Sequence, residues 1–127
     1  MGAKYSVKVD QAKNRLYLIL EGFFSEAEAK SAADEVIVQA RKMKPGFSVV
    51  NDISKAQPFS EEGTAHIQRA QSFLQQQGVG RVIRVVEARN ILSRMQFERK
   101  GKEAGYTASQ EVAATLEEAD RMLDAKA

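Results

Sequence analysis

The stretch NDISKAQPFSEEGTAHI, residues 51–67, decides the fold because a strand, a loop and a helix meet within it. Residues 47–53 form an apolar run that predicts a buried strand. Pro58 lies in the loop that follows, and Ser60 stands where a helix N-cap is expected. The helix that begins there is expected to end at Gly78, because glycine commonly follows the last helical residue.

Toward the N-terminus, the sequence predicts two strands and a helix. Apolar and polar residues alternate over 5–10, and an apolar run covers 16–20, so these segments predict an antiparallel hairpin. The sequence SEAE at 25–28 has the form of a capping box. The helix after it is expected to run to about residue 44, because Pro45-Gly46 then stops it.

Toward the C-terminus, residues 81–86 predict a strand that runs parallel to 47–53 after a helical crossover. A third helix is expected from Asn90 through about Ala104, and a short edge strand over 111–113. TLEE at 115–118 predicts a capped last helix. The whole chain, 1–127, therefore predicts one α/β domain: a single-layer mixed sheet of four or five strands covered by four helices.

Composition narrows the function. The chain has 127 residues, no cysteine and a net charge of +2. The lack of cysteine excludes disulfides, thiolate zinc sites and cysteine nucleophiles, and it suits a cytoplasmic protein. The charge is too small to argue for nucleic acid, and no apolar run is long enough to span a membrane. We expect no metal and no cofactor.

The opening stretch also resembles a known family. Element order and motif are similar to the STAS domain, the fold of bacterial anti-sigma-factor antagonists, across nearly the whole chain. That family carries Asp-Leu-Ser at the end of its third strand and Asp-Ser-Ser-Gly at the next helix start. Asp52-Ile53-Ser54 fits the first motif, and Ser60-Glu61-Glu62-Gly63 falls where the second would be. The resemblance implies a regulatory protein that binds a kinase or another regulator, and this chain is a divergent case.

The sequence departs from the family motif at the serine whose phosphorylation regulates partner binding. In the family the second serine of Asp-Ser-Ser-Gly is phosphorylated, and here Glu62 takes that position, with Glu61 before it. A carboxylate carries less charge than a phosphoserine and has fewer acceptor oxygens. The site is either fixed in a state similar to the phosphorylated one, or has lost the switch. Both glutamates also suit the first turn of a helix, and Ser54 and Ser60 remain as hydroxyls that a kinase could modify.

A second candidate site involves Arg84, Met95 and Phe97. Arg84 lies within a strand expected to be central, where a charge is unusual. It could pair with Asp52 or a helix carboxylate, or it could bind an anionic ligand. On the third helix, Ile91, Leu92 and Met95 are expected to face the core.

A further stripe on the third helix joins Ser93, Phe97, Gly101 and Ala104. The segment around Tyr106, a second subunit or an apolar ligand could cover this stripe. It therefore suggests a homodimer, or a carrier for a small apolar or lipid-like ligand.

An enzyme is the third hypothesis. His66 lies four residues after Glu62, a spacing that places both on one helix face. No nucleophile accompanies them, and two ligands are too few for a typical metal site. We therefore expect a non-catalytic regulatory or protein-interaction module, with its contact residues at Asp52, Ser54 and 60–63, and a small-ligand carrier as the alternative.

Overall fold

The computed structural model describes residues 3–87, 91–106 and 108–125, with the side chain of residue 91 left aside. Five strands and four helices follow one another along the chain. In order they are β1 (Lys4–Asp10), β2 (Arg15–Gly22), α1 (Glu26–Ala40), β3 (Ser48–Ala56), α2 (Glu61–Gln77), β4 (Arg81–Val85), α3 (Ile91–Glu103), β5 (Ser109–Ala113) and α4 (Leu116–Asp124). This order matches the predicted one, including the short fifth strand.

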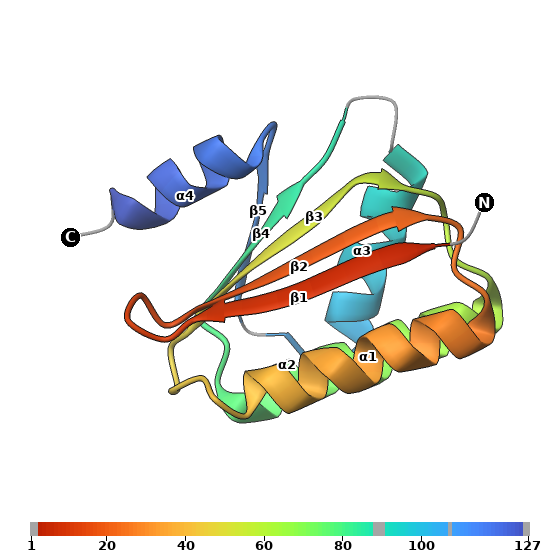
Figure 1. The fold of residues 1–127 in the computed structure, drawn as a ribbon, viewed down its shortest axis with the longest axis horizontal. Coiled ribbons are helices and arrows are strands. Elements are labelled where there is room, and N and C mark those ends of the chain that lie inside the picture. The colour runs from red at the N-terminus through yellow and green to blue at the C-terminus, as the bar shows by residue number, and fades with distance from the viewer. Residues whose placement is uncertain (1–2, 88–90, 107, 126–127) are drawn as a thin grey trace.

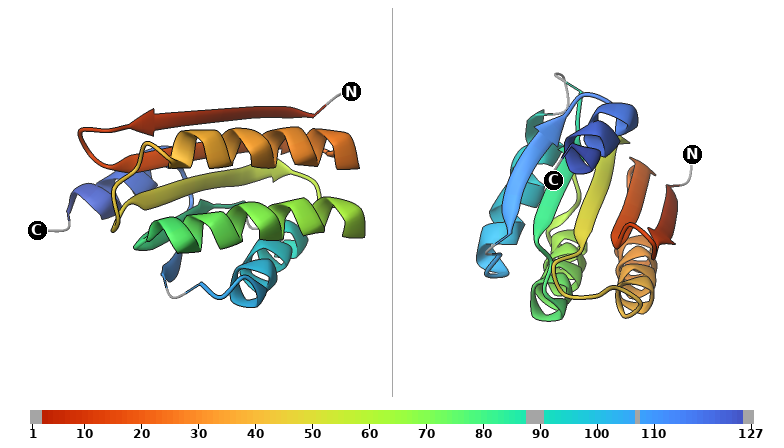
Figure 2. Two further views of the ribbon diagram at one scale, coloured as in Figure 1. Left: turned by 90° about the horizontal axis from the view of Figure 1, so that it is seen from below. Right: turned by 90° about the vertical axis from the view of Figure 1, so that its left-hand side faces the viewer.

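The strands form one mixed sheet in the spatial order β1-β2-β3-β4-β5. β1 and β2 pair antiparallel, as predicted, and every later neighbour pairs parallel. From β2 to β5, each strand is added on the same side of the one before it. Right-handed crossovers between these parallel strands therefore place their helices on the same face of the sheet. Figures 1 and 2 show α1 and α2 side by side across one face and α4 on the other. The fold is therefore an α/β sheet with helices on both faces.

Two apolar layers hold the sheet between these helices. On the α1–α2 face, buried side chains include Leu16, Val36, Val49, Leu74 and Val82. On the α4 face, the buried cluster consists of Val50, Ile83, Val85, Ala113, Ala119 and Leu123. Neighbouring residues of β3 and β4 alternate between the two clusters, as the period of a β-strand requires.

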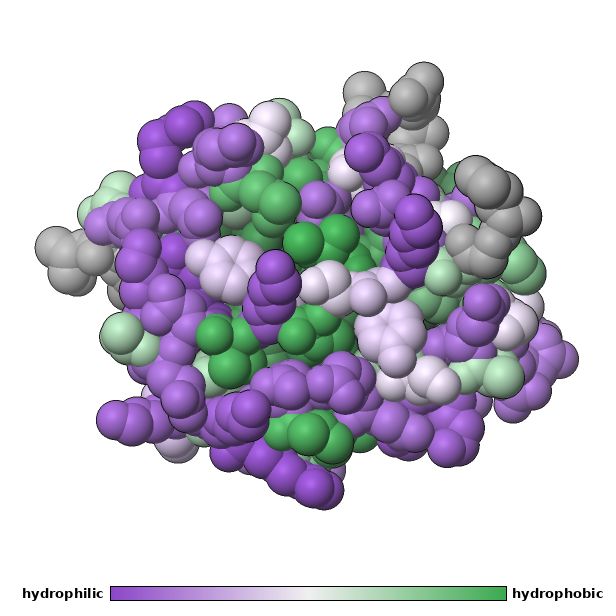
Figure 3. Space-filling model, viewed as in Figure 1, coloured by the Kyte–Doolittle hydropathy of each residue, from purple (hydrophilic) through white to green (hydrophobic). Residues whose placement is uncertain are grey.

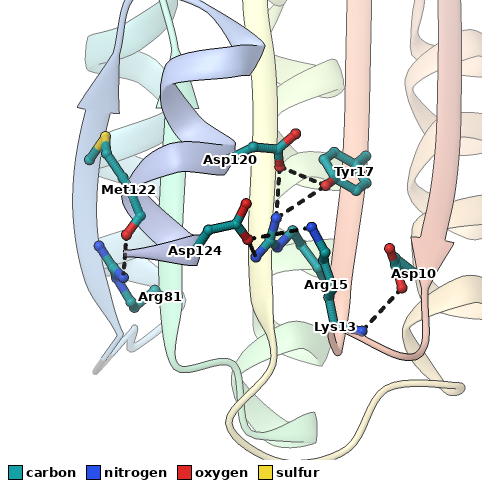
Figure 4. Close-up of polar contacts among 8 residues, drawn as sticks. All are labelled: Asp10, Lys13, Arg15, Tyr17, Arg81, Asp120, Met122 and Asp124. Atoms are coloured by element: carbon teal, nitrogen blue, oxygen red, sulfur yellow. Dashed lines mark hydrogen bonds and ion pairs between the residues drawn. The ribbon is translucent and has the colours of Figure 1, made fainter. Parts of the chain in front are cut away.

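One polar cluster fastens α4 to the sheet, as Figure 4 shows. Arg15 of β2 donates to Asp120 and Asp124, each at 2.8 Å. Tyr17 donates to the same oxygen of Asp120 at 2.6 Å. Burial opposes the charge of Arg15, but its hydrogen bonds with Asp124, Tyr17 and Asp120 raise its pKa above the ordinary value. Arg15 is thus a buried cation with two carboxylate partners.

The first helix is shorter than predicted. It ends at Ala40 rather than near residue 44, and the chain then turns. The side chain of Asn14 explains the early end, because its amide bonds both the N–H and the carbonyl of Lys44. These bonds hold the backbone in the turn that leads into β3.

The third helix presents a different face to the core than predicted. Leu92 and Met95 are exposed, by 67% and 56%. Ser93, Phe97 and Gly101 are buried instead, and Tyr106 packs so closely that a Cβ on Gly101 would lie 2.9 Å from its ring. Of the three covers considered for this stripe, the segment around Tyr106 is therefore the one that the structure shows. The prediction of a homodimer loses the observation on which it rested. Asn90, where the third helix was expected to begin, lies outside the described residues.

Across the described ranges, none of the helices combines the length and apolar character needed to cross a membrane.

Candidate functional site

The predicted contact residues lie on a continuous piece of chain, residues 52–63, which we call the 52–63 segment. Its first part is the end of β3. Asp52 lies between Ile19 and Val85 in register, on the face of the sheet that carries α4. Its Oδ1 accepts from the N–H of Ser54 at 3.0 Å and from the Ser54 hydroxyl at 2.6 Å. Asp52 and Ser54 are therefore bound to each other and half-buried.

The second part of the segment begins α2. Ser60 is the N-cap, and its hydroxyl accepts from the N–H of Gly63 at 3.1 Å. Glu61 and Glu62 occupy the first turn and are exposed. Neither forms an ion pair with another described residue, so their charges face solvent at the positive end of the helix. The predicted capping role of Ser60 is confirmed.

Between these two parts, Phe59 anchors the segment. Its ring stacks on Phe24 with centroids 5.0 Å apart and meets Phe97 edge-on at 5.8 Å. Its backbone N–H donates to Gln96 Oε1 at 2.8 Å, and its carbonyl accepts from Gln96 Nε2 at 2.9 Å. Ser93 adds a hydrogen bond to the carbonyl of Ala56. The segment is therefore fixed to α3 and to the core.

Figure 3 shows apolar side chains gathered on the face of the sheet next to α4. α4 packs against β3, β4 and β5, so the β1–β2 side of this face is left more open. Ile19 lies there, beside Asp52 in register, and is half-buried. Asp52 and Ser54 thus border this surface, whereas Glu61 and Glu62 lie at the start of the helix that covers the opposite face.

The expected pair of His66 and Glu62 is not formed. His66 Nε2 lies 3.5 Å from a carboxylate oxygen of Glu26 on α1 instead. α1 and α2 pack side by side, so His66 turns toward the neighbouring helix rather than along its own. Within the described residues, no three side chains of the metal-binding types come together.

Arg84 was expected to pair with Asp52 or a helix carboxylate, and it does neither. Alternation along β4 directs Arg84 to the α1–α2 face, whereas Asp52 faces α4. Its Nη1 donates to Gln110 Oε1 at 2.7 Å, and its Nη2 to the carbonyl of Phe97 at 3.2 Å. Burial lowers the pKa of Arg84.

Arg84 and Phe97 both line an internal cavity of about 50 Å³, but Met95 does not. The prediction that Met95 belongs to this site is therefore wrong, because Met95 points to solvent. Two further polar residues line the cavity: Asn51 of β3 and Gln71 of α2. Neither residue was predicted from the sequence, although an amide within the predicted strand 47–53 was a signal for Asn51.

Comparison with known proteins identifies the fold. No family model matches the chain, and no curated protein matches it either. Among solved structures, the anti-sigma factor antagonist SpoIIAA in its unphosphorylated form is 12% identical, with a TM-score of 0.68 over 98% of this chain and 99% of that one.

Two further structures have the same arrangement. One is an uncharacterised protein of the DUF3478 family from Shewanella loihica, described as having a SpoIIAA-like fold. It is 10% identical, with a TM-score of 0.68 over 96% of this chain and 94% of that one. The other is an anti-sigma factor antagonist from Mycobacterium paratuberculosis, 13% identical, with a TM-score of 0.61 over 97% and 95% of the two chains. The chain therefore has a SpoIIAA-like fold, which is the fold that the resemblance to the STAS domain implied.

Proposed function

We propose that this chain is a non-catalytic protein-interaction module, and that its contact surface is the 52–63 segment. The partner is a regulatory protein, such as an anti-sigma factor or a kinase, with basic groups that face Glu61 and Glu62. Support comes from the likeness in fold to proteins described as anti-sigma factor antagonists. A cytoplasmic location forms part of this proposal, and the cysteine-free composition suits it.

The observation that carries the proposal is a charged surface on a fixed backbone. Ser60 caps the helix, Gln96 accepts from the N–H of Phe59 and donates to its carbonyl, and stacking on Phe24 holds the Phe59 ring. Glu61 and Glu62 therefore present two carboxylates in a set geometry, which lowers the ordering cost when a partner binds. A carboxylate cannot be phosphorylated, so we propose that this negative charge is constant and is not switched at these positions.

The test uses charge reversal at a matched pair of positions. Glu62 and Glu117 both occupy the second residue of a helix whose N-cap is a hydroxyl residue, and both are exposed. Glu62→Lys and Glu117→Lys therefore have similar costs from the helix dipole. They differ in location, because Glu117 lies at the start of α4.

Immobilised wild-type protein and the two variants are used to capture proteins from cells that make this chain. We expect one regulatory protein to bind the wild type and Glu117→Lys, and to bind Glu62→Lys at least about tenfold more weakly. Equal binding by all three would contradict the role of the 52–63 segment. Loss of binding with Glu117→Lys alone would move the contact surface to α4.

A further inference from the structure

The internal cavity contains three polar side chains that the fold does not satisfy. It lies between the sheet and helices α1 and α2, and apolar residues form most of its wall. Asn51, Gln71 and Arg84 are exposed by only 5%, 5% and 1%. Each has one atom without a hydrogen-bond partner among the described residues: Asn51 Oδ1, Gln71 Oε1 and Arg84 Nε. A buried polar atom without a partner costs free energy.

Backbone register explains why these groups meet. Asn51 and Arg84 are direct neighbours across β3 and β4, and both side chains face the helices. Gln71 reaches the same point from α2, and its Nε2 donates to the carbonyl of Phe97 at 3.2 Å. That bond orients the amide, so Oε1 is the atom left for another partner. The cavity thus presents one donor, Arg84 Nε, and two acceptors.

The charge of Arg84 also lacks a counterpart. An arginine stays protonated in proteins, and no carboxylate of the described residues forms an ion pair with it. Its partners, Gln110 and the Phe97 carbonyl, are neutral. Burial raises the pKa of Tyr106, so its phenol is neutral as well and supplies no negative charge. The contrast is Arg15, the other buried arginine among the described residues. Its Nε also lacks a hydrogen-bond partner, but its charge has two carboxylate partners.

We propose that this cavity is a binding site for a small carboxylate that carries a hydroxyl group. The carboxylate accepts from Arg84 Nε and neutralises the guanidinium, and the hydroxyl donates to Asn51 Oδ1 or Gln71 Oε1. This site is separate from the 52–63 segment and does not depend on the proposed interaction function.

Cavity volume sets the size of the ligand. One water molecule needs roughly 10–15 Å³ of such space, so a cavity of about 50 Å³ accepts three to five water molecules, or a ligand with about that many non-hydrogen atoms. A lipid-like chain is larger than this. Glycolate has five non-hydrogen atoms and both required groups, which makes it the probe. The alternative occupant is water, which can satisfy all three atoms but leaves the charge of Arg84 without a counterion.

The experiment is a titration of the intact protein with glycolate, followed through the ¹⁵N–¹H signals of the Arg84 Nε–H and the Asn51 and Gln71 side-chain amides. Acetate, which lacks the hydroxyl, and ethylene glycol, which lacks the charge, are the matched ligands. We expect saturable shifts with glycolate in the millimolar range, binding of acetate about tenfold weaker, and no shift with ethylene glycol.

Variants separate this site from general effects. Arg84→Met keeps the volume and removes the charge, and we expect the affinity for glycolate to fall at least tenfold. Arg69→Met, at an exposed arginine of α2 that pairs with Asp34, should bind as the wild type does. Asn51→Leu removes one of the two acceptors. If Arg84→Met does not fold, the loss of glycolate affinity is measured with Asn51→Leu instead. Arg84 signals that stay unchanged at glycolate concentrations far above the millimolar range would show that glycolate does not enter the cavity, and would overturn the proposal in favour of water. Equal binding of acetate would overturn the hydroxyl assignment.

Discussion

At the scale of the residue, Gly63 shows how the 52–63 segment depends on close packing. Its backbone needs no special φ angle, but a Cβ placed there would lie 3.2 Å from the Phe59 ring and 3.3 Å from the Ser60 hydroxyl. The Phe59 ring is held between Phe24 and Phe97 and has little room to move. The lack of room for a side chain therefore explains why glycine occupies position 63, whether or not Gly63 also contacts a partner.

We predict that Gly63→Ala lowers the free energy of unfolding. Crowding of Phe59 is an overpacking effect that typically costs about 1–3 kcal/mol, and the opposing gain in helix propensity is at most about 1 kcal/mol. Urea denaturation followed by circular dichroism measures the change. Ala65→Gly, an exposed position one turn into the same helix, separates helix propensity from packing. A rise in stability with Gly63→Ala would show that Phe59 can move aside.

Among single residues, caps and glycines were readable from the sequence. Ser25, Ser60 and Gly78 have the roles their neighbours in the chain predicted. Thr115 caps α4 through the N–H of Glu118, but the Glu118 carboxylate accepts from Ala114 rather than closing a box with Thr115. The partners of Arg84 and His66 could not be predicted, because they come from elements distant in sequence.

At the scale of the element, the attachment of α4 depends on the ionisation of its carboxylates. Asp124 accepts from Arg15, and this hydrogen bond is the main reason that its pKa is lowered. A carboxyl group whose pKa is lower in the folded state stabilises the fold above its ordinary pKa of about 4. That stabilisation is lost as the pH falls through the lower, folded-state value. Lys13, Arg15, Tyr17 and Asp120 are the other titratable groups at this contact.

We therefore predict that Asp124→Asn lowers thermal stability at pH 7 and that the difference from the wild type shrinks as the pH falls below about 4. Thermal unfolding at a series of pH values measures it. Glu117→Gln, which removes an exposed carboxylate of the same helix, should cost less than Asp124→Asn at pH 7, because only a weak interaction with the helix dipole is lost. A difference between Asp124→Asn and wild type that persists at low pH would mean that shape, rather than charge, holds α4.

The third helix shows where pattern analysis of an element fails. Its sequence has two apolar stripes, and the stripe with Ile91, Leu92 and Met95 was expected to face the core, while the stripe with Phe97 was expected to need a second cover. α3 packs against α2 and the segment after it, and only the side with Ser93 and Gly101 is narrow enough for this contact. Small residues at a close approach were the better signal, and hydrophobicity alone could not reveal it.

At the scale of the whole molecule, element order was sufficient to predict the fold. The hairpin and the alternation of strands and helices predicted the β1–β2 pair, the parallel β3–β4 pair and a mixed sheet covered by helices, because right-handed crossovers leave few alternatives. The full order β1-β2-β3-β4-β5 comes from the structure. The cavity was not predictable in the same way. It forms where side chains of Asn51, Gln71 and Arg84 meet from three elements, and no spacing in the sequence indicates such a meeting.

The central claim is that a regulatory protein binds the 52–63 segment, and backbone hydrogen exchange tests it most directly. Exchange is compared for the chain alone and with the captured partner. We predict that the amides of residues 54–64 exchange at least about tenfold more slowly in the complex, because binding covers the segment and adds to its opening free energy. The first turn of α4 should exchange at the same rate in both. Slower exchange at α4 or on the outer face of α3, with residues 54–64 unchanged, would contradict the account.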